Sequence, residues 1–273
     1  MQTRDSLKLL LLQIRQEQYK VPTGMSAFEL ALEMMNHVGD IDAELRDKLI
    51  YSTLSRWSKN NEFTFEQLRC LLRFSLDERH LFWGIGEVET DTVFTRSFSV
   101  LLVPLAVQVH NRSSFLIENE IHCIKRTLMQ YIELEQDLRG FVSGKGWAHA
   151  IAHAADALAA IADSPFLKPD DLLDILHIIK KKICIGRHAF IYNEDERLVT
   201  VVTTILRRGL LEDHISMEWI SGLGVIKNSG ILPDDDILRA NTKCFLRSLY
   251  FRLMAQKDLG RFKDTVIESL KLL

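Results

Sequence analysis

The sequence predicts an all-α protein, built as a HEAT/ARM-like α-solenoid of about twelve helices in antiparallel pairs. Apolar residues recur at three- and four-residue spacing along the chain, as at Leu45, Leu49, Ile50, Leu54 and Trp57. No segment combines strict apolar/polar alternation with an Asn-Gly or Asp-Gly hairpin signal. Many helices joined by short turns favour stacked pairs over one irregular helical bundle, which is the alternative architecture.

Helix-start signals divide the chain into these elements. Ser26–Glu29 and Thr64–Gln67 match the capping-box pattern, in which two side chains bond to each other's backbone N–H groups. Asn193–Glu196 is a third start, and Pro169 and Pro233 each begin an acidic first turn, which the helix dipole favours. These signals and the apolar spacing predict helices near 3–19, 26–37, 42–59, 64–82, 91–110, 115–137, 146–162, 169–185, 194–211, 216–223, 235–257 and 260–272.

Composition limits the class of protein. With 273 residues, 47% hydrophobic and 26% charged, the chain can bury a sizeable core, and we expect one solenoid domain over residues 1–273. The net charge of -3 disfavours a general nucleic-acid binder, whose affinity comes mostly from phosphate neutralisation. The four cysteines form no CxxC pair, which favours free thiols in a reducing compartment.

The most apolar stretch, Phe98–Val109, spans 12 residues and contains Pro104. A membrane span needs about 20 residues. We therefore expect a cytoplasmic protein that has no membrane partner.

The stretch from Arg139 to Ala162 is the most distinctive part of the chain. His149, His153 and Asp156 follow i, i+4, i+7 spacing and so share one face of a predicted helix. No Lys, Arg, Glu or Gln occurs between Gly146 and Ala162, although these residues fill ordinary solvated helix faces. We expect this helix to be covered on both sides, with its His/Asp face against another element or lining a groove.

Two histidines at this spacing can bind one metal ion, so His149 and His153 are candidate ligands of a divalent metal, and no other cofactor is predicted. The zinc-protease pattern fails because Ala150 stands where a Glu is required, and no adjacent His-Asp pair exists. A third ligand would come from a neighbouring helix, from among Glu118, His122, Glu133 and Glu135. The alternatives are histidines that hydrogen-bond between helices, and a ligand-binding or catalytic role without metal.

Charged residues near this helix are further candidates. Arg96 is the only Lys, Arg, Asp or Glu between Asp91 and Arg112, so a buried guanidinium in need of an acidic partner is expected. Glu133, Glu135, Asp137 and Asp156 are the acids available to it, and Arg139 is expected in the same network. Lys145, between two glycines, marks either a tight turn or an anion site before the helix.

A basic stripe lies near the C-terminus. Arg239, Lys243 and Arg247 recur at four-residue spacing, and residues 239–273 hold eight Lys or Arg against three Asp or Glu. A solvated helix face and a docking surface for an acidic partner both fit this stripe.

Several segments resemble one bacterial protein family that is known only as a domain of unknown function. They are the run Tyr131–Asp156 with its Gly-Lys-Gly-Trp-Ala-His centre, Asp91–Ser99 and Asn193–Arg197. The resemblance covers most of the chain and implies a helical, HEAT-like fold. It implies no activity.

The leading functional prediction is a scaffold that binds an unidentified protein or peptide along a concave surface. The candidate groove residues are Arg96, Glu135, Asp137, Arg139, Lys145, Trp147, His149, His153 and Asp156. One alternative is a metal-dependent or small-molecule-processing enzyme that uses the His149/His153/Asp156 face. Another is nucleic-acid binding through the basic C-terminal helices, which the net charge disfavours.

Overall fold

The structure is a computed structural model that describes residues 3–273. It is 66% helical and 1% strand, which confirms the all-α prediction. The chain forms two compact units, Met1–Ala157 and Leu158–Leu273. The finer assignment as a solenoid stays a prediction.

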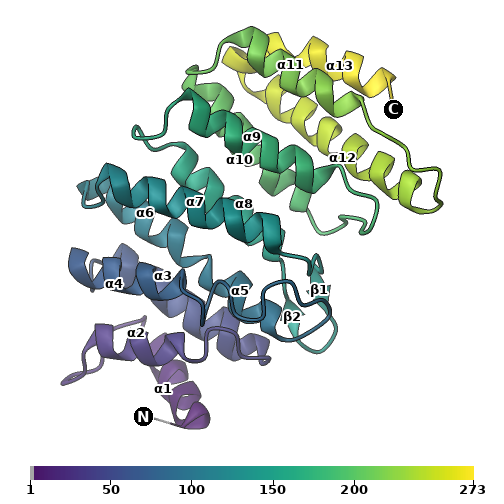
Figure 1. The fold of residues 1–273 in the computed structure, drawn as a ribbon. Coiled ribbons are helices and arrows are strands. Elements are labelled where there is room, and N and C mark those ends of the chain that lie inside the picture. The colour runs from purple at the N-terminus through teal and green to yellow at the C-terminus, as the bar shows by residue number, and fades with distance from the viewer. Residues whose placement is uncertain (1–2) are drawn as a thin grey trace. The chain divides into compact units, whose positions relative to one another are not determined.

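The N-terminal unit contains most of the residues singled out by sequence. Helix α3 packs on α6 and on the π-helix, and α4 packs on α2 and α6. A two-residue hairpin, β1 with β2, precedes α8. The elements are α1 (Arg4–Gln16), α2 (Ala27–Met35), a π-helix (Glu44–Tyr51), α3 (Ser52–Lys59), α4 (Phe65–Ser75), α5 (Thr92–Ser99), α6 (Leu102–Ser113), α7 (Glu118–Leu134), β1 (Phe141–Val142), β2 (Gly146–Trp147) and α8 (Ala150–Ala162), whose last residues belong to the second unit (Figure 1).

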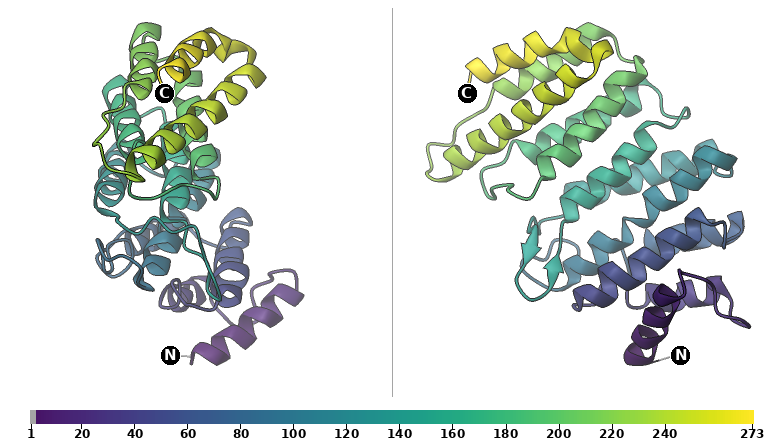
Figure 2. Two further views of the ribbon diagram at one scale, coloured as in Figure 1. Left: turned by 90° about the vertical axis from the view of Figure 1, so that its right-hand side faces the viewer. Right: turned by 180° about the vertical axis from the view of Figure 1, so that it is seen from behind.

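In the C-terminal unit, α10 packs on α12 and α11 packs on α13. Trp219 on α11 donates from Nε1 to the carbonyl of Leu176 on α9 at 2.9 Å, so this large buried ring has a polar partner. The helices are α9 (Pro169–Ile183), α10 (Glu194–Arg208), α11 (Asp213–Gly224), α12 (Asp234–Ala255), a 3-10 helix (Lys257–Phe262) and α13 (Lys263–Lys271) (Figure 2).

The expected helix starts lie where the sequence placed them. Thr64 and Gln67 form the complete capping box of α4. Ser26 accepts a hydrogen bond from the backbone N–H of Glu29, which is half of the predicted box. The third start is at Asn193, whose side chain makes no capping hydrogen bond.

Three predicted helices were too long, each for a local reason. The helix expected over 64–82 ends at Ser75, and Asp77 then accepts hydrogen bonds from the backbone N–H of Arg79 and from Nδ1 of His80. The helix expected over 91–110 is two helices, α5 and α6. Pro104 lacks the N–H that would bond to the carbonyl of Val100, which instead accepts from the N–H of Val103 at 3.1 Å.

The helix expected over 146–162 begins only at Ala150. Gly144, Gly146 and His149 all have positive φ, and this backbone folds the preceding residues into the hairpin instead of a helical turn.

One stretch in residues 3–273, Thr92–Ser113, is long and apolar enough to cross a membrane by length and composition alone. Its most apolar window is 83% buried inside the structure, a pattern that core helices of globular proteins share.

Candidate functional site

Arg96 and Glu135 form a completely buried ion pair, each with a side chain 0% exposed. Arg96 donates from Nε to Oε2 of Glu135 at 2.6 Å and from Nη2 to Oε1 at 2.9 Å. Burial alone would lower the pKa of Arg96, but the hydrogen bond and charge of Glu135 raise it above its ordinary value. The expected acidic partner of Arg96 is therefore confirmed, and it is Glu135.

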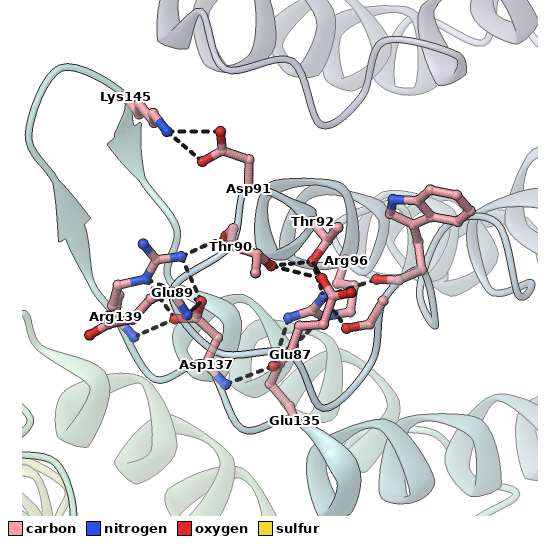
Figure 3. A network of polar contacts seen from close by, with 12 residues as sticks. Glu87, Glu89, Thr90, Asp91, Thr92, Arg96, Glu135, Asp137, Arg139 and Lys145 are labelled. Atoms are coloured by element: carbon pink, nitrogen blue, oxygen red, sulfur yellow. Dashed lines mark hydrogen bonds and ion pairs between the residues drawn. The ribbon is translucent and has the colours of Figure 1, made fainter.

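The third guanidinium nitrogen of Arg96, Nη1, holds the loop between α4 and α5. Nη1 donates to the carbonyls of Trp83 at 2.9 Å and Gly84 at 3.0 Å, and to Oγ1 of Thr92 at 2.9 Å. The guanidinium thus has partners on all sides, as a buried charge requires (Figure 3). Because all three guanidinium nitrogens are engaged within the chain, the geometry assigns Arg96 a structural role.

Asp137 and Arg139 extend this network along the segment after α7. The backbone N–H of Asp137 donates to Oε1 of Glu135 at 2.9 Å, and Arg139 donates from Nη2 to Oδ2 of Asp137 at 2.6 Å. Asp137 Oδ2 also accepts from the N–H of Glu89, and Arg139 donates to the carbonyl of Thr90 (Figure 3). The acids and arginines of residues 96–139 therefore fix the loop before α5.

Arg46 is a second buried arginine, which the sequence analysis missed. Its guanidinium carbon lies 4.3 Å from the ring centre of Phe94 and 4.7 Å from that of Phe98. Nη2 donates to the carbonyl of Lys145 at 2.8 Å, in the turn of the β1–β2 hairpin. Burial lowers the pKa of Arg46. The carboxylate of Asp47, whose Oδ1 lies 2.8 Å from Arg46 Nε, offsets part of this shift. The hydrogen bond to Lys145 joins residues 99 apart in the sequence, so no local sequence signal predicts it.

His153 on α8 packs against α5. His153 Nδ1 lies 3.0 Å from the carbonyl oxygen of Ser97, and its ring meets that of Phe98 edge-on at 5.1 Å. His149 stacks on Trp147 at 4.2 Å and lies 5.8 Å from His153 between ring centres. His153 thus contacts another element as expected, but His149 precedes the first residue of α8 with φ of 49° and does not share a helical face with His153 and Asp156. Both histidines and Asp156 are half-buried.

The metal hypothesis lacks the ligand set that it requires. Within residues 3–273, no group of three or more His, Cys, Asp or Glu is arranged to hold a metal ion. Among the proposed third ligands, Glu135 is committed to Arg96, and His122 lies 3.8 Å from Glu118 on α7. The contacts of His149 and His153 are those of packing residues.

Lys145 and the basic stripe, two further candidates from the sequence, do not contact His149 or His153 in the interactions described above. Lys145 forms an ion pair with Asp91 at 2.7 Å, so its ammonium group ties the hairpin to the start of α5. On α12, Arg247 is exposed, whereas Arg239 and Lys243 are half-buried, so the basic stripe is not a uniformly solvated face.

One apolar concave feature of the N-terminal unit was not predicted. It is a groove of about 410 Å³ between α4 and α7, called here the α4–α7 groove. Its apolar floor includes Leu72, Leu116 and Ile124, which are at most 5% exposed. The full lining is Arg69, Leu72, Arg73, Leu76, Leu116, Asn119, Glu120, Cys123, Ile124 and Thr127.

A set of contacts beside Arg69 fixes the two walls of this groove. Arg69 donates from Nε to Oε1 of Glu120 at 3.0 Å and from Nη2 to the carbonyl of Phe115. Glu120 also accepts the backbone N–H of Ile117 at 2.9 Å, which caps α7. Phe65 and Phe115 stack with ring centres 5.2 Å apart. The groove is therefore preformed. Its two walls are held together by residues such as Arg69 and Glu120, which are 51 residues apart in the sequence.

Comparisons with known proteins place the chain in a family without giving it an activity. No curated protein and no solved structure matches it significantly. The profile of the family described as "Protein of unknown function (DUF2785)" matches residues 81–251, which include Arg96, Glu135 and the whole of α8. Since this match covers more than half of the 273 residues, the chain belongs to the DUF2785 family.

Proposed function

We propose that this protein binds an apolar segment of a partner protein in the α4–α7 groove. The observation that carries the proposal is a preformed groove of about 410 Å³ with an apolar floor and a polar rim. Pockets of this size, mostly apolar and with a few placed polar groups, are the usual form of binding sites.

The dimensions of the groove favour a short peptide segment. On α4 and the residue that follows it the lining runs from Arg69 to Leu76, and on α7 from Asn119 to Thr127. At 1.5 Å per residue these walls are about 10–12 Å long, enough for about two turns of a bound helix. An amphipathic helix that inserts one apolar face into such a groove is a common mode of peptide recognition.

The α-solenoid is part of the same proposal. Packing of α10 on α12 and of α11 on α13 supports it, because stacked helical pairs bring each helix beside the one two positions further on. We place the protein in the cytoplasm, which the four free cysteines favour.

Selection of peptides on the immobilised protein tests this proposal. A phage-displayed library of helical peptides is selected on the wild type and counter-selected on Cys123→Trp, which fills the groove from an exposed position. Gln130→Trp is the matched control, since Gln130 is exposed on the same helix and does not line the groove.

We expect peptides with apolar residues at i, i+3 and i+4 that bind the wild type and Gln130→Trp equally and bind Cys123→Trp at least about tenfold more weakly. Failure to enrich any sequence over the counter-selection would contradict the proposal. So would peptides that bind all three proteins alike.

A further inference from the structure

The N-terminal unit has a second concave feature, separate from the α4–α7 groove. It is a pocket of about 410 Å³, called here the Trp83 pocket, and it is more polar than the groove. Its volume suits a ligand of one or two rings. Its walls are the segment 35–40 at the end of α2, together with Phe74, Arg79, His80, Trp83 and Thr95.

Aromatic side chains make up much of this pocket. Trp83 is 51% exposed and Phe74 is 39% exposed, so part of each ring is accessible to a ligand. The ring of Phe74 lies 5.1 Å from that of His80. Exposed aromatic faces beside a cavity provide stacking surfaces for a planar ligand.

His80 lines the pocket, is 95% buried and is held in one orientation. Its Nδ1 lies 2.8 Å from Oδ1 of Asp77, so the carboxylate accepts the Nδ1 proton. This contact leaves Nε2 as a hydrogen-bond acceptor on the other side of the ring. A buried imidazole fixed by a carboxylate is a built polar feature of the pocket.

The charges around the pocket favour an anion. Arg79 is exposed, and within residues 3–273 no acidic side chain forms an ion pair with its guanidinium. Asp40, the acid in the lining, is already paired with Arg4, whose Nε lies 2.7 Å from Oδ2 of Asp40. Asp77 is engaged by His80 and by the backbone N–H of Arg79. Arg79 therefore supplies the uncompensated charge at this pocket.

The backbone of the pocket is rigid at two points. Arg96, held by Glu135, donates to the carbonyl of Trp83 and so fixes the position of the Trp83 backbone. Gly39 approaches Thr95 so closely that a Cβ at this position would lie 2.5 Å from the backbone nitrogen of Thr95. Preorganised walls reduce the entropic cost of binding a ligand.

We propose that the Trp83 pocket binds a small aromatic carboxylate, whose ring stacks on Trp83 and Phe74 and whose anionic group pairs with Arg79. This site goes beyond the peptide-binding function proposed above and does not depend on it, since it uses other residues.

Isothermal titration calorimetry with 1-naphthoate and 1-naphthamide tests this assignment, because the two probes share a ring system and differ in charge. We expect naphthoate to bind the wild type about fivefold more tightly than naphthamide, by an amount that falls with added salt. Arg79→Gln should reduce naphthoate affinity to that of the amide and leave naphthamide affinity unchanged. Trp83→Ala should weaken both probes by about fivefold.

Arg73→Gln is the matched control, because Arg73 is also exposed but lines the α4–α7 groove. We expect it to leave both affinities unchanged. Both pocket substitutions alter exposed side chains, and circular dichroism checks that the variants fold. The assignment is overturned if naphthoate does not bind at concentrations up to about 5 mM. Equal naphthoate affinity in the wild type and Arg79→Gln, or in the wild type and Trp83→Ala, would also overturn it.

A peptide that ends in phenylalanine carries the same chemistry as a free aromatic carboxylate. Comparing N-acetyl-phenylalanine with a tetrapeptide that ends in phenylalanine separates the two sources. Equal or tighter binding of the single residue supports a free small molecule. Clearly tighter binding of the tetrapeptide would assign the pocket to a peptide terminus and overturn the proposal.

Discussion

Glu135→Gln removes the charge opposite Arg96 while it keeps the size and shape of the side chain. Both side chains are fully buried, and Arg96 donates to both carboxylate oxygens of Glu135. In glutamine one of these oxygens is replaced by an NH2 group, which cannot accept, so one of the two hydrogen bonds is lost. Removing one partner of a buried ion pair costs about 3–5 kcal/mol, because the other charge stays in a medium of low polarity. Trp83, Gly84 and Thr92 still accept from Arg96, so we expect the lower end, about 3 kcal/mol.

Urea unfolding followed by tryptophan fluorescence measures this loss. Trp57, Trp83 and Trp147 lie in the N-terminal unit, so the signal reports mainly on the unit that contains the pair. Glu133→Gln is the control, since it makes the same substitution two residues away at an exposed position, and we expect a change within about 0.5 kcal/mol. A cost below about 1 kcal/mol for Glu135→Gln would refute the reasoning, because the pair would then not be compensating a buried charge.

Three further predictions concern other parts of the N-terminal unit. Gly39→Ala should lower the free energy of unfolding in urea by about 1–3 kcal/mol, because its Cβ would overlap the backbone of Thr95. Gly260→Ala is the control, since Gly260 has open space around it, and should change this free energy little. Equal effects would argue against the close approach of Gly39 to Thr95. His149→Ala should be less stable than His149→Gly by about 1 kcal/mol in thermal unfolding, because φ is 49° there and both lose the ring; the reverse order would be contrary to this account.

The third concerns acid stability. The hydrogen bond from Lys8 lowers the pKa of Asp42, so its contribution to stability is present above the unfolded pKa of about 3.9 and is lost as pH falls through the folded value. Lys8→Met should therefore flatten the fall in melting temperature between about pH 5 and pH 3, and parallel curves for both proteins would exclude the effect.

The helical class and most helix positions follow from local patterns, which is why the sequence predicted them. The capping box at Thr64 and Gln67 depends on residues three positions apart. Arg96 was also predictable, since a lone charge in an apolar helix implies a buried partner. The choice of Glu135 among four acids was open, because it depends on where the chain after α7 returns.

Long-range geometry explains the features that the sequence analysis missed. Arg46 bonds to Lys145, which is 99 residues further along the chain, and Arg69 bonds to Glu120, 51 residues away. Both concave features are made by residues from separate elements whose approach has no local signature. The spacing of His149 and His153 suggested a metal site, but spacing alone did not reveal that His149 precedes the helix or that His153 faces the backbone of α5.

The reactivity of Cys123 tests the proposed groove most directly, since this exposed thiol lines it and needs no mutation. The measurement is the rate of maleimide modification of Cys123, with and without a saturating selected peptide, by peptide-mapping mass spectrometry. Cys244 is exposed in the C-terminal unit and serves as the internal control. The account predicts that the peptide slows modification of Cys123 at least about tenfold and leaves Cys244 unchanged. Unchanged modification of Cys123 under saturating peptide would contradict binding in the α4–α7 groove.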